Sequence, residues 1–155
     1  MRTTPTLIII AAAAGCLFAA DLPKLPGPPL KQVELRGRVV CLAEEMERLH
    51  DVELPSHHEH VYGLKMSDGR YYTLLRTRNS EAIFTDAEVR AKDLLLKGKI
   101  FPHTDLFEAV TLRCVRDGKV YDLVYYCDIC HIFTIAPGIC ECCKGPTTLI
   151  ERPIE

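Results

Sequence analysis

The sequence predicts a mainly β protein with one short helix and a cysteine-rich appendage at its C-terminus. Between residues 33 and 124, short segments of alternating apolar and polar residues recur, separated by turn-forming residues such as Asp68 and Gly69. After them, five of the chain's eight cysteines fall within residues 125–145. These observations indicate a folded β domain at 33–124 and a small tail at 125–155 that is held together through its sulfur atoms.

The first twenty residues have the pattern of a secretory signal peptide. Arg2 supplies the basic start, an apolar run extends from Leu7 to Ala14, and small residues follow. We therefore expect an exported protein, located in the periplasm or outside the cell, with residues 21–32 as a proline-rich linker. Residues 13–16 also resemble a lipoprotein box, and only lipidation at Cys16 would attach the protein to a membrane.

Turn and cap signals bound the elements of the β domain. The expected strands are 33–41, 61–66, 71–76, 94–101, 107–115 and 120–127. Ser67–Arg70 supplies the turn of a hairpin, and AEEMERL at 43–49 adds a helical turn after the first strand. The one short helix is expected at Thr85–Lys92, with Thr85 as the N-cap and Glu88 at capping-box spacing.

Three strands, a short helix and two more strands, over residues 31–116, resemble the OB-fold, a small Greek-key barrel. The resemblance rests on the order of the elements and implies an OB-like β-barrel. A β-sandwich or a split barrel would generate a similar pattern, and these alternatives stay open at this point.

Two C-x-x-C pairs in the tail have the spacing of metal ligands. They are Cys127 with Cys130 and Cys140 with Cys143, and a Pro-Gly turn precedes the second pair. Each pair places two thiolates on one tight loop, so two pairs can surround Zn²⁺ as a tetrahedron. Residues 132–135 are expected to form a strand between the pairs, and Leu149 and Ile150 to form a hairpin beside it.

This tail resembles a zinc ribbon, which implies a structural zinc site with four cysteine ligands. It also resembles the small heavy-metal-binding segments found beside metal-transporting ATPases, through Tyr125, Pro137, Gly138 and the cysteines. That family has a histidine at the position of Cys130 and methionines that are missing here, so a transport role is not implied.

Other chemistries compete for the same cysteines. In an oxidising compartment they could form disulfides, and Cys127, Cys130 and His131 match the attachment motif of a c-type haem. Haem is the weakest of the three, because it leaves the second C-x-x-C pair without a purpose. Cys142 and His131 are further candidate metal ligands, and Cys142 also makes the site easier to oxidise.

A histidine-rich loop suggests a second metal site. His57, His58 and His60 lie between the first two strands, and in an OB-like barrel His103 would come from a loop on the same side. The competing interpretation is a solvated loop that binds nothing. Cys41 and Cys114 fall on apolar strand faces, where a cysteine commonly serves as a small buried side chain.

The sequence therefore favours an exported, non-enzymatic binding module with a structural zinc site. Its partner would be a protein or a small ligand, and a nucleic acid is not expected because the net charge is −2. The main alternative is periplasmic handling of copper or zinc by a redox-sensitive metal-binding protein, and a haem protein is the second alternative. No nucleophile-base pair, phosphate-binding loop or telling carboxylate pair indicates an enzyme.

Overall fold

The structure is a computed structural model that describes residue 27 and residues 29–154, and it is mainly β. Its strands are β1 (Lys31–Cys41), β2 (Tyr62–Met66), β3 (Tyr71–Leu74), β4 (Leu94–Ile100), β5 (Leu106–Arg116), β6 (Lys119–Cys127), β7 (Ile132–Thr134) and β8 (Thr148–Pro153). Its helices are α1 (Leu42–His50), α2 (Glu81–Thr85) and α3 (Ala87–Arg90). The predicted signal peptide and lipidation site lie outside the described residues.

The first five strands form one set of pairings. Strand order runs β3-β2-β1-β4-β5, and β3 also pairs with β5 in parallel, so the pairings return to the strand from which they started. Gly98 in β4 sits at a register shift against β5, where an added Cβ would lie 2.0 Å from the carbonyl oxygen of Glu108. A glycine is therefore required where these two strands approach each other.

The main core lies between these strands and the two short helices α2 and α3. Its fully buried side chains include Leu64, Ile83, Val89, Leu96 and Phe107. The alternation of apolar residues that predicted the strands reflects this burial, since successive residues of a strand face opposite sides of the sheet.

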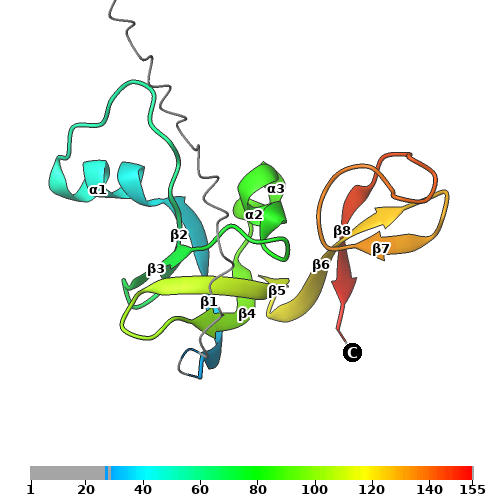
Figure 1. The fold of residues 1–155 in the computed structure, drawn as a ribbon, viewed down its shortest axis with the longest axis horizontal. Helices are drawn as coiled ribbons and strands as arrows, with labels where there is room; N and C mark the ends of the chain where they lie inside the picture. Colours follow the sequence, from blue (N-terminus) through cyan, green and yellow to red (C-terminus); the bar gives the residue numbers. More distant parts are fainter. Residues whose placement is uncertain (1–26, 28, 155) are drawn as a thin grey trace, which may run out of the picture.

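Strand β6 belongs both to this sheet and to the cysteine-rich tail. Its first half pairs with β5, its last residues pair with β7, and β8 pairs along Tyr121–Tyr126. Strand β8 runs along one edge of β6, beside both the residues that pair with β5 and those that pair with β7. Strands β5 and β7 therefore both lie along the other edge of β6, one after the other. The tail strands project to one side of the other elements (Figure 1).

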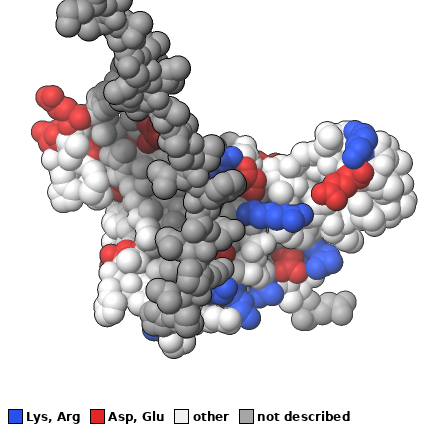
Figure 2. All heavy atoms as spheres, in the orientation of Figure 1, with Lys and Arg blue, Asp and Glu red and all other residues white. Residues whose placement is uncertain are grey.

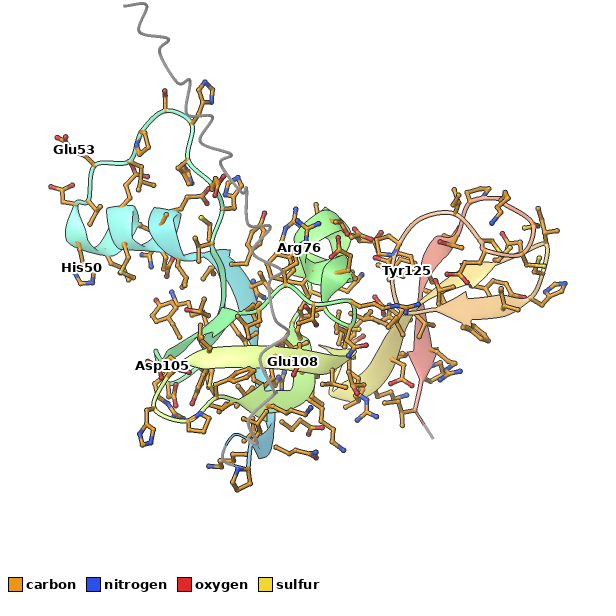
Figure 3. All side chains as sticks on the ribbon, viewed as in Figure 1. His50, Glu53, Arg76, Asp105, Glu108 and Tyr125 are labelled. Carbon is orange, nitrogen blue, oxygen red and sulfur yellow. The ribbon has the colours of Figure 1, made fainter. Side chains whose placement is uncertain are left out.

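Side-chain bonds fix the tail against the helices. The Tyr125 hydroxyl donates to Asp86 over 2.6 Å, and Lys92 pairs with Glu151 of β8 at 3.0 Å. Tyr125 lies between the tail and the α2–α3 segment (Figure 3). Burial and the Asp86 carboxylate raise the pKa of Tyr125 well above its usual range, which keeps the hydroxyl protonated as a donor.

Three details of the sequence-based prediction are corrected. Within the described residues, three helices occur where one short helix was expected: the turn predicted at 43–49 extends into α1, and Glu81–Thr85 forms α2 just before the segment predicted to be helical. Asp86, not Thr85, caps α3, and its carboxylate accepts from the Glu88 N–H at 2.8 Å. Residues 149 and 150 pair with β6 and not with the 132–135 strand.

Candidate metal centres

The first cysteine pair lies at the tip of the hairpin between β6 and β7. Cys127 is the last residue of β6, and its carbonyl accepts from the His131 N–H at 2.8 Å. This bond closes a tight loop over residues 127–131 that ends with His131 at a φ of 55°. The loop turns the Cys127 and Cys130 thiols to the same side.

The second pair repeats this geometry on a different segment. The Cys140 carbonyl accepts from the Lys144 N–H at 2.9 Å, and Lys144 has a φ of 60°. A bridge between Ile139 and Pro146 holds the base of the loop together. Two equivalent knuckles, 127–131 and 140–144, therefore face each other across the tail.

The four thiols of the knuckles converge on one point. The sulfur atoms of Cys127, Cys130, Cys140 and Cys143 all lie within 4.8 Å of one another, and Cys127 Sγ is 3.5 Å from Cys143 Sγ. Four thiolates at about 2.3 Å from a tetrahedral Zn²⁺ would be about 3.8 Å apart. These four cysteines are therefore close enough to bind one metal ion, which disulfide pairing would not require.

Burial and backbone bonding prepare the thiols for a cation. Cys127 and Cys140 are fully buried, whereas Cys130 and Cys143 are partly exposed. The backbone N–H groups of Cys143 and Cys142 point at the Cys140 sulfur and lower the pKa of that thiol to about 7. The neighbouring Cys142 and Cys143 sulfurs, together with burial, raise the pKa of the Cys130 thiol well above its usual range. A metal ion would bind these sulfurs after the thiols have lost their protons.

The two further candidates of the tail stand beside these four cysteines. Cys142 is exposed and its sulfur lies next to Cys130, but it is not part of the four-sulfur group. The His131 imidazole pairs through Nδ1 with the Tyr126 hydroxyl. This arrangement favours metal over haem attachment, because the Cys127 and Cys130 thiols both face the second knuckle.

A second group of ligand atoms occurs near the histidine-rich loop. It consists of Cys41, Glu44, His58 and His60, whose ligand atoms all lie within 4.8 Å of one another. The structure thus brings together two of the four histidines expected there, while His57 and His103 are outside the group. The sequence pattern indicated a core position for Cys41 and no ligand role for Glu44, although Cys41 lies just before the predicted helical turn at 43–49 and Glu44 lies within it.

Comparison of the chain with known protein families, curated proteins and solved structures gives no match. Among the described residues, no helix has the length and apolar character needed to cross a membrane. The function must therefore be inferred from the two groups of metal-ligating side chains and from the sheet that supports them.

Proposed function

We propose that the chain is an exported, non-enzymatic binding module in which a C-terminal zinc ribbon is held by structural Zn²⁺. The observation that carries this proposal is the convergence of four sulfurs, two from each knuckle, within 4.8 Å. Four protein thiolates fill a tetrahedral shell and leave no position for a substrate, as in structural zinc sites.

The composition of the tail supports a structural role for the metal. Several large apolar side chains of the tail stay exposed, among them Ile129 at 69% and Ile139 at 68%. The two knuckles therefore bury little apolar surface besides the cysteines themselves. Structural Zn²⁺ contributes on the order of 10 kcal/mol at neutral pH, which is enough to fold a segment of this size.

The pairing pattern of the first five strands supports an OB-like Greek-key barrel as the body of the module. Antiparallel pairings link β3, β2, β1, β4 and β5, and the parallel β3–β5 pairing joins the two ends of this series. The α2–α3 segment lies between β3 and β4, which is the place that the OB-like order gives to its helix.

The surface of the module favours a protein or a small ligand as its partner. Where Figure 2 leaves the surface visible, Lys and Arg side chains form small groups beside Asp and Glu side chains and no continuous basic surface for a nucleic acid. The exposed apolar side chains of the tail, such as Phe133 at 48%, suit contact with a protein. Export to the periplasm or beyond is supported by the pattern of the first twenty residues.

The test is elemental analysis with thiol counting on protein purified from the export compartment. We expect bound zinc, and we expect Cys130→Ser to lose one equivalent of it. Cys142→Ser is the matched control, since Cys142 lies outside the four-sulfur group. Protein without metal whose tail thiols resist alkylation would contradict the proposal and indicate disulfides, whereas Soret absorbance would indicate haem bound through Cys127 and Cys130.

Metal handling is a second candidate function, favoured by the exposed Cys142 beside the partly exposed Cys130. A fifth thiol at the edge of a four-thiolate site provides an entry for ligand exchange with Zn²⁺ or Cu(I). Competition with a chelator separates the two functions. A structural site releases its metal slowly whether or not Cys142 is present, and a handling site releases it quickly through Cys142.

A further inference from the structure

The loop between α1 and β2 carries two histidines back to the end of β1, over the start of α1. Cys41 is the last residue of β1, Glu44 lies in the first turn of α1, and His58 and His60 come from the loop. We propose that these four residues form a second metal site, which binds a divalent ion of the Zn²⁺ type through a thiolate, a carboxylate and two imidazoles.

The distances within the group fit ligands of one cation better than they fit hydrogen bonds. Glu44 Oε1 lies 3.4 Å from His58 Nε2 and 3.3 Å from His60 Nδ1. Both separations exceed the 2.7–3.2 Å usual for N–H···O bonds. Nitrogen and oxygen ligands of a tetrahedral Zn²⁺ would be about 3.4 Å apart.

The sulfur fits the same geometry. Cys41 Sγ lies 3.7 Å from His58 Nε2. A thiolate and an imidazole bound to one tetrahedral Zn²⁺ would be about 3.6 Å apart. Cys41 is buried with 7% exposure, so its thiolate would be shielded from water on the protein side of the ion.

Backbone contacts hold the two chain segments that carry the ligands, the β1–α1 junction and the end of the histidine-rich loop, next to each other. Cys41 pairs with Tyr62 across β1 and β2, and the Leu42 N–H donates to the Val61 carbonyl at 2.8 Å. Leu42 also packs so closely on Gly63 that an added Cβ there would lie 2.5 Å from its Cδ2. These contacts bring the end of the loop against the start of α1, where His60 meets Glu44.

Helix α1 is fixed in turn by the residue that follows Glu44. The Glu45 carboxylate accepts from Tyr71 Oη at 3.0 Å and pairs with Lys65, so it joins α1 to β3 and β2. The backbone that carries the Glu44 side chain is therefore held in place. Preorganised ligands of this kind lose little conformational entropy when a metal binds.

The surrounding charge attracts cations. Residues 42–61 contain six acidic side chains and one arginine, Arg48. Figure 2 shows acidic side chains gathered over α1 and the loop that follows it. Glu44 and His60 are each 51% exposed, so the ion would be reached from solvent. This site is therefore expected to exchange metal faster than the more enclosed site of the tail.

The test is the metal stoichiometry of the full chain, measured with Zn²⁺ and with Co²⁺ as a spectroscopic probe. We expect two equivalents per chain for the unaltered protein and one for the double variant Glu44→Gln/His60→Ala. Both changes are at half-exposed side chains, so the fold is expected to persist. His57→Ala is the matched control, because His57 is a neighbouring histidine outside the group, and it should keep two equivalents.

The absorption of Co²⁺ distinguishes this site from the tail. In Cys130→Ser protein, the remaining ion should give the weak sulfur charge-transfer band of one thiolate, and Cys41→Ser should abolish that band. A double variant that keeps the stoichiometry of the unaltered protein would overturn the second site. Unaltered protein that binds a single equivalent, with the Cys41-dependent band of one thiolate, would overturn the proposed zinc ribbon and leave this inference standing.

Discussion

Two residues beside the cysteine knuckles adopt backbone angles that glycine tolerates best. His131 and Lys144 follow the second cysteine of each pair and have φ values of 55° and 60°. A side chain in this left-handed region costs about 1–2 kcal/mol, because Cβ approaches the following carbonyl oxygen. The sequence tolerates this cost at the two positions where the chain must turn back after a knuckle.

Replacing Lys144 with glycine should therefore stabilise the tail. The removal of strain is partly offset by the greater freedom of glycine in the unfolded chain, so the net gain is about 0.5–1 kcal/mol. Thermal unfolding of the metal-bound protein measures this gain. Lys144→Val is the opposite control, since a β-branched residue at positive φ should lower the melting temperature, and equal melting temperatures for the two variants would contradict the strain.

Cys142 differs from its neighbours in being exposed and outside the four-sulfur group. We expect Cys142→Ser to keep the full metal content and to slow the loss of metal under mild oxidation, because the most accessible thiol is removed. Cys140→Ser, which replaces a fully buried ligand, should lower metal affinity instead. Metal content after timed exposure to peroxide checks both expectations. Equal losses of metal in the two variants would contradict the assignment of Cys140 as a ligand and of Cys142 as an oxidation-sensitive thiol outside the site.

At the scale of elements, a single carboxylate connects helix α1 to the β2–β3 hairpin. Hydrogen bonds from Arg48 foremost, then Lys65, lower the pKa of Glu45 to about 2. The folded state therefore favours the ionised form. Its stabilising contribution is present above the unfolded value near pH 4.5 and is lost as the pH falls from there toward 2.

Glu45→Gln should remove this contribution at neutral pH. We expect a loss of about 1–3 kcal/mol, because Lys65 and Arg48 lose their charged partner. Urea unfolding at several pH values measures it. The variant should approach the stability of the unaltered protein as the pH falls toward 2, and Glu47→Gln, at a neighbouring position of the same helix, is the control that should change little.

The sequence predicted those features that depend on neighbouring residues. The C-x-x-C spacing predicted the knuckles, because each pair is closed by local hydrogen bonds such as that from His131 to Cys127. The alternation of apolar and polar residues likewise predicted the strands, because it is a pattern of neighbouring residues along the chain. The cap of α3 was assigned one residue too early, since Thr85 and Asp86 are both competent caps and only packing decides between them.

The second group of ligands could be predicted only in part. A cluster of histidines is visible in the sequence, but the inclusion of Cys41 depends on its pairing with Tyr62 across two strands. Glu44 belongs to the group because α1 begins directly after β1. The first turn of α1 therefore faces the loop that leads from α1 to β2. Such contacts arise from strand register, which a single sequence specifies weakly.

At the scale of the whole molecule, β6 is the structural link between the body and the metal-binding tail. Its first residues pair with β5, and its last residue is the metal ligand candidate Cys127. Leu149 of β8 packs against the main core, and Tyr125 of β6 belongs to it. The strands of the tail are thus anchored in the body, whereas the two knuckles beyond them depend on their sulfurs.

Removing the metal should therefore unfold the tail in part and leave the body intact. With a chelator present, we expect amide hydrogen exchange to become fast in residues 128–147, where the described chain has few buried apolar side chains. Protection should persist in β1, β4 and β5, and in the part of β6 that pairs with β5, because those amides are bonded within the main sheet. Exchange measured by mass spectrometry with and without chelator makes the comparison, and the Glu44→Gln/His60→Ala variant removes any contribution from the second site. Uniform loss of protection would mean that the metal supports the entire fold, whereas unchanged protection in 128–147 would mean that the knuckles are held by something other than a metal ion.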